Sequence, residues 1–317
     1  MASFEDALLG LQSARFEEAK SIFAELLQSD PDNAEYQSGF YASGYWANRA
    51  EMARGSESPR PGTGLMEQWD GFQEIAEKKG FASTRSLKSA MKAVLGRAAE
   101  QYRQKFQREG MAHPDLSDLE ELGTCLLRIQ DYENAREILH YARRIQPSRA
   151  AVQFLLGEAY LNENDQESLE RGLGYYRDGF IIQPAQFDPS LAFSSMVQDL
   201  LQSLGEKLEN NLDRIILWLP AHMMARSQFG GLRRLNRDEV SQLQRETHRL
   251  EKDLSGVMDK FREKVQARLC FYYLVLHQAA VFVYQEPDYA KELLDSLKEL
   301  SVELCNFVKS AKNTSRP

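Results

Sequence analysis

The sequence predicts an all-α protein, in which a solenoid of helical hairpins is followed by a C-terminal bundle of long antiparallel helices. Two stretches, 116–149 and 150–186, repeat one pattern of apolar and small residues at helical spacing, and each contains a closing proline. Glycine and proline are sparse, with 19 and 10 among 317 residues, and no alternating run of β-branched residues indicates a strand. These observations predict helices along the whole chain.

The apolar residues of each copy recur at steps of three and four, which places them on one face of a helix. The first copy runs Leu119-x-x-Leu122-Gly123-x-x-Leu126, then Tyr132-x-x-Ala135-x-x-x-Leu139-x-x-Ala142, and closes at Pro147. The second runs Leu156-Gly157-x-x-Tyr160, then Leu169-x-x-Gly172-x-x-x-Tyr176-x-x-Gly179, and closes at Pro184. A glycine inside a helix costs about 1 kcal/mol relative to alanine, so its recurrence predicts helices that approach closely where they cross.

This pattern resembles the tetratricopeptide repeat family, whose period is about 34 residues. A third match lies at the N-terminus, where Phe16-x-x-Ala19-x-x-x-Phe23 is followed by Pro31. The tryptophan that the family carries early in each repeat is missing from all three copies. The resemblance implies stacked hairpins with a concave groove, lined by the first helix of each repeat, that binds other proteins.

The resemblance also implies which side chains line that groove, namely those that face away from the packing within each hairpin. They are Glu120, Thr124, Leu127, Arg128, Phe154, Glu158, Leu161 and Asn162. Glu120 and Glu158 stand where chaperone-binding members of the family carry Lys, Arg or Asn, so we do not expect binding of a chaperone tail. A groove of apolar and acidic groups suits a helix or extended peptide that carries Lys or Arg.

We expect the solenoid to occupy residues 1–186 and the C-terminal bundle residues 187–317. The glycine- and proline-rich segment 54–64 is interpreted as a loop within the solenoid, and a domain boundary is the alternative. Aromatic residues are frequent between Tyr36 and Trp69. We interpret them as core packing between helices, and an aromatic-lined groove for a peptide is the alternative.

A helix predicted over 83–108 has one apolar side and one basic side. Between Lys78 and Arg108 nine Lys or Arg and one acid give a local charge of +8, so the rest of the chain carries −8 − 8 = −16. The candidate contact residues of this basic face are Arg85, Lys88, Lys92, Arg97 and Arg103. We interpret the face as solvated or neutralised by acidic helices nearby, and binding of an acidic protein, nucleic acid or anionic lipid is the alternative.

The C-terminal part predicts two long helices. Apolar residues trace one helical face from Phe193 to Leu219, and a heptad seam runs from Val240 to Phe261. We expect these helices to pair antiparallel within the chain, and a parallel homodimeric coiled coil is the alternative. The apolar run 269–284 is shorter than the roughly 20 residues that a bilayer requires, so we expect a core helix and no transmembrane segment.

The sequence lacks the common motifs of catalysis and metal binding: no phosphate-binding loop, no His-Glu-x-x-His pair and no closely spaced cysteines. Cys125, Cys270 and Cys305 are predicted to be reduced, buried thiols. The start of the chain has no basic segment and no apolar signal core, which indicates the cytoplasm. We therefore expect a cytoplasmic scaffold or adaptor that binds a protein partner, without enzymatic activity, metal or cofactor. The net charge of −8 gives no general attraction to nucleic acid.

Overall fold

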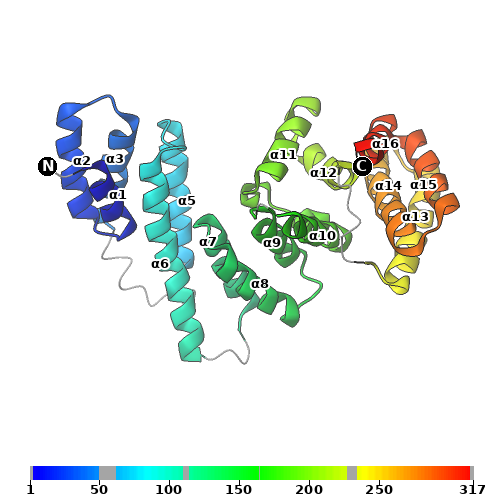
Figure 1. Cartoon of the computed structure of the whole chain (residues 1–317), viewed down its shortest axis with the longest axis horizontal. Helices are drawn as coiled ribbons and strands as arrows, with labels where there is room; N and C mark the ends of the chain where they lie inside the picture. Colours follow the sequence, from blue (N-terminus) through cyan, green and yellow to red (C-terminus); the bar gives the residue numbers. More distant parts are fainter. Residues whose placement is uncertain (1–2, 50–61, 110–113, 164, 227–233, 315–317) are drawn as a thin grey trace. The chain divides into compact units, whose positions relative to one another are not determined.

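The structure is a computed structural model that describes residues 3–49, 62–109, 114–163, 165–226 and 234–314 (Figure 1). All regular structure in these ranges is helical, which confirms the predicted all-α class. The chain forms two compact units, Met1–Ile145 and Gln146–Pro317. The hairpin that we expected to end the solenoid at residue 186 therefore lies in the second unit. Most of the segment 54–64 lies outside the described residues.

The first unit is organised around one long helix, α6 (Arg85–Glu109), which packs on α1, α3, α5 and α7. Its apolar side is buried as predicted, including Leu95, Ala98 and Tyr102. The other described helices of this unit are α1 (Phe4–Gln12), α2 (Phe16–Ser29), α3 (Ala34–Ala47), α5 (Thr63–Lys78), α7 (Leu116–Arg128) and α8 (Tyr132–Ile145). Polar N-cap residues begin several of them: Asn33 and Asp115 accept hydrogen bonds from first-turn amides of α3 and α7.

Glycines allow the hairpins α2/α3 and α7/α8 to close. A Cβ on Gly39 would lie 2.2 Å from the Phe23 ring, and one on Gly123 would lie 2.6 Å from Leu139 Cδ2. Both distances are shorter than van der Waals contact, so a larger residue would force the helices apart. The close approach predicted for the first repeat from Gly123 is therefore present.

Substitution of Gly39 tests this packing. Gly39→Ala is expected to lower the free energy of unfolding by about 1–3 kcal/mol, because the added methyl group overpacks against the buried Phe23 ring. Gly71→Ala in α5 is the matched control, because no atom lies within 4 Å of its added Cβ. That variant should gain up to about 1 kcal/mol from helix propensity. Urea unfolding measures both, and a stabilised Gly39→Ala protein would contradict the packing.

The second unit encloses a large apolar core to which most of its helices contribute. Its hairpin of α9 (Ala150–Leu161) and α10 (Gln166–Ile182) is joined to that core by Phe180, whose ring lies 6.2 Å from Phe271. Two short 3-10 turns follow α10, at Pro184–Gln186 and Pro189–Leu191. The remaining elements are α11 (Ser195–Lys207), α12 (Leu212–Arg226), α13 (Arg237–Gly256), α14 (Asp259–Ala279), η3 (Ala280–Tyr284), α15 (Pro287–Leu300) and α16 (Val302–Thr314).

The long helices predicted for this unit are broken. The face from Phe193 to Leu219 is split between α11 and α12, because Glu209 and Asn210 both have φ of 55° and a right-handed helix cannot continue through them. The heptad seam ends at Gly256, and its last predicted position, Phe261, already belongs to α14. The predicted pairing of two long helices is therefore wrong: α13 packs on α14.

Helix α14 forms the centre of the second unit. Residues 259–284 contain an 18-residue window apolar enough to cross a membrane, yet 67% of that window is buried inside the protein. Such burial is typical of a core helix, as predicted. Arg268 of α14 donates hydrogen bonds to the carbonyl oxygens of Phe180 (2.6 Å) and Ile181 (3.1 Å), which satisfies the C-terminal end of α10.

Other predictions about the interior are also confirmed. Trp46, Trp69 and Phe72 are buried, and the two indole rings stack with centroids 6.0 Å apart, so this part of the aromatic-rich region is core. Cys125, Cys270 and Cys305 are free and buried. Burial raises the pKa of Cys125 and Cys270 to about 12, so both thiols remain protonated near neutral pH.

Candidate interaction surfaces

The predicted groove residues of the first repeat are largely occupied within the protein. Thr124 and Leu127 are buried, and the Thr124 hydroxyl donates to the Glu120 carbonyl oxygen at 2.9 Å. Arg128 donates to Asp70 Oδ1 at 2.6 Å and to Gln73 Oε1 at 2.9 Å, and both partners belong to α5. Arg128 therefore joins α7 to α5 and does not offer its charge to a partner.

Of the four predicted groove residues of the second repeat, Phe154 and Glu158 are buried, and Leu161 and Asn162 are half-buried. Phe154 packs among Tyr176, Phe180 and Phe187, and Leu161 touches the helix crossing at Gly172. Asn162 donates to the Glu158 carbonyl oxygen at 2.8 Å, which closes the end of α9. The prediction that Thr124, Leu127, Phe154 and Glu158 face an open groove is wrong. Helix α9 is apolar around most of its circumference, and a helix of this kind is usually buried on most of its sides, as α9 is.

Glu158 is a buried carboxylate that holds the start of a distant helix. It is 1% exposed, and it accepts hydrogen bonds from the amides of Phe193 (2.7 Å) and Ser194 (2.6 Å), directly before α11. The hydroxyls of Ser194 (2.9 Å) and Tyr176 also donate to it. Burial raises the pKa of Glu158 above its usual range, and these donors oppose the rise because they favour the carboxylate.

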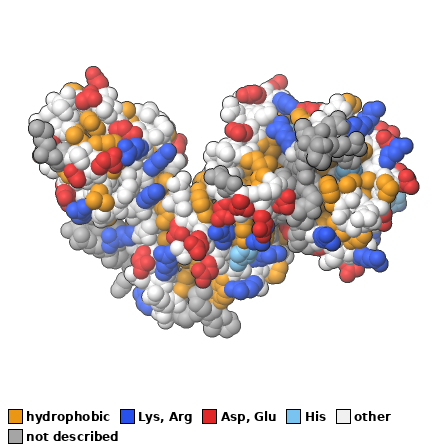
Figure 2. Space-filling model, viewed as in Figure 1, with side chains coloured by type: hydrophobic (Ala, Val, Ile, Leu, Met, Phe, Trp, Pro, Cys, Tyr) orange, Lys and Arg blue, Asp and Glu red, His pale blue; other side chains and the backbone are white. Residues whose placement is uncertain are grey.

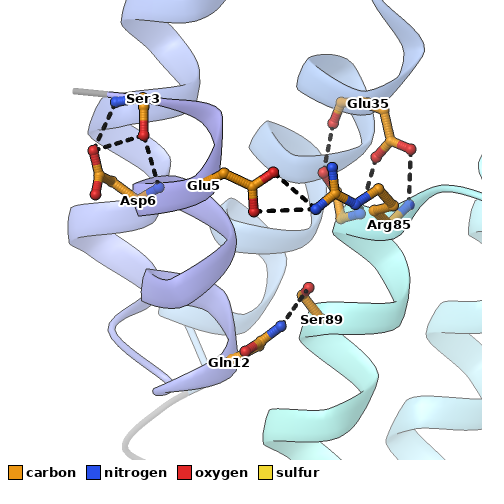
Figure 3. A network of polar contacts seen from close by, with 8 residues as sticks. Ser3, Glu5, Asp6, Gln12, Glu35, Arg85 and Ser89 are labelled. Atoms are coloured by element: carbon orange, nitrogen blue, oxygen red, sulfur yellow. Dashed lines mark hydrogen bonds and ion pairs between the residues drawn. The ribbon is translucent and has the colours of Figure 1, made fainter. Parts of the chain in front are cut away.

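The first unit uses the same device at the start of α6 (Figure 3). Glu35 of α3 accepts from the amides of Arg85 (2.8 Å) and Ser86 (3.0 Å), which are the first two residues of α6. In each unit a glutamate therefore caps a helix that lies far along the chain. The carboxylate satisfies free amides and complements the positive end of the helix dipole.

The basic face is partly neutralised by acids of its own unit. Arg85 forms an ion pair with Glu5 at 2.8 Å (Figure 3), and Arg103 approaches Asp131 at 4.0 Å. The other three predicted contact residues, Lys88, Lys92 and Arg97, are exposed and have no ion-pair partner within the described ranges. The acids that neutralise the face are thus Glu5 and Asp131, which confirms in part the interpretation of a neutralised face.

Two polar clusters join α6 to its neighbours below the surface. Lys105 forms an ion pair with Asp118 of α7 at 2.6 Å, and Asp118 is fully buried. Tyr102 and Thr63 both donate to Glu121 Oε2, and Thr63 does so at 2.7 Å. Burial is the main reason that the pKa of Tyr102 lies above its usual range. Since these charges tie α5, α6 and α7 together, we assign them a structural role.

His222 lies inside the second unit, where burial lowers its pKa from 6.5 to about 4. The Glu303 carboxylate opposes this shift, and the positive charges of Lys207 and Arg226 add to it. Its Nδ1 has no hydrogen-bond partner among the described residues. The neutral imidazole is therefore the form that the fold accommodates.

This lowered pKa predicts a pH dependence of stability. Between pH 6.5 and about 4 the unfolded chain binds a proton at His222 that the folded protein does not, so stability falls as the pH falls through that window. The total loss should be roughly 3 kcal/mol, because each unit of pKa difference corresponds to about 1.4 kcal/mol. His222→Gln cannot titrate, so its urea-unfolding free energy should decline less steeply over the same range. Parallel profiles for both proteins would contradict the assignment.

The second unit has a surface pocket of about 560 Å³ where η3 meets α15. Its wall is mostly apolar and comes from Ala280, Val281, Pro287, Ala290 and Leu294. Gln285 and Lys291 supply its polar groups. The pocket forms where the helix widens into a π-turn, a feature that is frequent at functional sites. The sequence showed no signal for this turn beyond the Pro287 that follows it.

A second apolar surface lies at the end of the same unit where α12, α14 and α16 begin. The ion pair Arg214–Glu263 (2.8 Å) joins the N-terminal ends of α12 and α14, and Lys207, the last residue of α11, pairs with Glu303 in the first turn of α16. The surface, which we call the helix-start surface, comprises Leu212 (54% exposed), Met258 (61%), Phe261 (45%) and Val302 (56%). Figure 2 shows apolar side chains at the surface of the C-terminal helices among interspersed charges.

Comparison with known proteins adds no family assignment: no protein-family model, curated protein or solved structure matches this chain. Within the described ranges, no cluster of three or more His, Cys, Asp or Glu residues has the arrangement of a metal site.

Proposed function

We propose that this protein is a cytoplasmic scaffold or adaptor of the tetratricopeptide type that binds a protein partner. The observation that supports this proposal is that the following buried charged side chains form hydrogen bonds or ion pairs with other groups of the protein. Glu158 caps a helix, Asp118 pairs with Lys105, and Arg177 pairs with Asp178 at 2.9 Å. Each of these groups is engaged with its own fold, where it offers no acid, base or nucleophile to a substrate.

The repeat pattern supports the same proposal. The hairpins α7/α8 and α9/α10 cross at small residues, as helical hairpin repeats do. Repeat proteins of this kind present extended surfaces that recognise other macromolecules. Because four of the eight predicted groove residues are buried, we propose that the contact lies on the exposed apolar features of the second unit, the π-turn pocket and the helix-start surface. Self-association through the helix-start surface is the alternative use of that surface.

Affinity capture of the tagged full chain from its native cells tests the proposal. The capture is done with and without nuclease, and recovered proteins are identified by mass spectrometry. We expect a protein recovered in fixed ratio to the bait after nuclease treatment. Recovery of nucleic acid alone, or of chaperones alone, would contradict the scaffold function.

A second candidate function is binding of an anionic polymer by the basic face. It rests on Lys88, Lys92 and Arg97, which are exposed and have no described ion-pair partner. If these three residues neutralise three phosphates, an increase from 50 to 200 mM salt should weaken duplex binding roughly 40-fold. Titration of a fluorescent duplex measures this, and no binding at 50 mM salt would remove the candidate.

A further inference from the structure

The π-turn pocket adjoins a stripe of acidic side chains on the same helix. Asp288, Glu292, Asp295 and Glu299 follow one another at steps of four, three and four along α15, which places them on one helical face. All four are exposed, and none has an ion-pair partner among the described residues. We call this set the acidic stripe.

The pocket and the stripe are neighbouring faces of α15. The pocket residues Pro287, Lys291 and Leu294 each precede a stripe residue by one position, which corresponds to about 100° around the helix. If a bound peptide inserts an apolar side chain into the pocket, the peptide residues next to that side chain therefore lie over the acidic stripe. Lys291 lines the pocket on the side of the stripe and Lys298 lies one helical step away, so the two lysines and the four stripe acids together carry 2 − 4 = −2 charges.

We infer that the pocket docks a segment of a protein partner that inserts one aliphatic side chain and lays Lys or Arg residues across the acidic stripe. This inference rests on the proposed scaffold function and names the chemistry of its partner. The apolar wall selects the aliphatic group, since burial of a CH₂ group contributes about 0.8 kcal/mol. The carboxylates of the acidic stripe, which have no described ion-pair partner, attract Lys or Arg residues next to the inserted side chain. Electrostatic complementarity of this kind contributes to binding specificity.

The test uses three synthetic peptides and the full chain with ¹³C-labelled methyl groups. The first peptide is acetyl-Leu-Lys-Gly-Lys-amide, the second replaces both lysines by glutamine, and the third replaces leucine by alanine. We expect the first peptide to shift the methyl signals of Val281, Ala290 and Leu294. Loss of the two positive charges should weaken binding about fivefold at low salt. Replacement of the leucine by alanine should weaken it by up to roughly 60-fold, because three carbon atoms leave the pocket.

Two matched variants separate the stripe from general charge attraction. Glu292→Gln/Asp295→Asn/Glu299→Gln neutralises three stripe residues, all exposed, and should abolish the preference for the lysine peptide. Glu25→Gln/Glu67→Gln/Glu74→Gln removes the same charge from exposed positions of the first unit and should retain the preference. Equal loss in both variants would overturn the inference. Tighter binding of acetyl-Leu-Glu-Gly-Glu-amide would also overturn it, because Lys291 would then recognise a carboxylate.

The outcomes distinguish this inference from the proposed function. Capture of a protein partner without peptide shifts at the pocket would discard the pocket and keep the scaffold. If the lysine peptide shifts the methyl signals of the pocket but no partner protein is captured, the inference about the pocket is supported and the proposed scaffold function is contradicted.

Discussion

Replacement of Glu158 by alanine is expected to lower the free energy of unfolding by about 3–5 kcal/mol, the largest effect of any single substitution that we predict here. The carboxylate is 1% exposed and accepts from two backbone amides and two hydroxyls. Its removal takes the acceptor from the amides directly before α11 and from the hydroxyls of Ser194 and Tyr176.

Urea unfolding followed by circular dichroism measures this loss. Trp218 is the single tryptophan of the second unit, so its fluorescence reports the unit in which Glu158 lies. Glu167→Ala is the matched control, because that glutamate is exposed and pairs with the exposed Arg171. Its loss should stay under about 1 kcal/mol. A Glu158→Ala protein as stable as the control would show that Glu158 does not hold α11.

Lys105→Met is expected to share this largest effect, with a loss of about 3–5 kcal/mol in the first unit. Asp118 is fully buried, its Oδ2 lies 2.6 Å from Lys105 Nζ, and its Oδ1 has no described hydrogen-bond partner. Methionine keeps the length and the apolar packing of the lysine stem. The substitution therefore isolates the lost charge and leaves a buried carboxylate without compensation.

A double variant provides the control. Lys105→Met/Asp118→Leu removes both charges, so it should be more stable than Lys105→Met, because an apolar pair can replace a buried ion pair at little cost. Urea unfolding of the two variants and of Asp118→Leu completes a double-mutant cycle. Additive losses would contradict the account, since they would mean that the two side chains do not interact.

Local patterns in the sequence predicted what depends on one helix or one hairpin. Helix α6 was predicted because its apolar side repeats at helical spacing, and it begins at Arg85 and ends at Glu109, close to the expected 83–108. The close approach at Gly123 was predicted because a helical glycine needs a compensating contact, and Leu139 provides it. Both inferences rely on neighbours within a few turns of the chain.

Predictions that required knowledge of the surroundings failed. Glu158 was assigned to an open groove, but the amides that it caps belong to residues 193 and 194, and nothing near Glu158 in the sequence indicates them. The break between α11 and α12 falls at Glu209 and Asn210, where no glycine or proline stands, and the Asn210-Asn211 pair is the local turn signal that the prediction of one continuous helical face did not use. The π-turn pocket likewise depends on how α14 ends against α15.

The proposed scaffold function is tested most directly by chemical crosslinking of the captured complex with lysine-reactive reagents, followed by mass spectrometry. The second unit offers Lys291 and Lys298 beside the π-turn pocket, and Lys260 and Lys264 beside the helix-start surface. We predict that a nuclease-resistant protein partner crosslinks mainly to these four lysines. Crosslinks confined to Lys88 and Lys92, or the absence of any partner protein, would contradict the account.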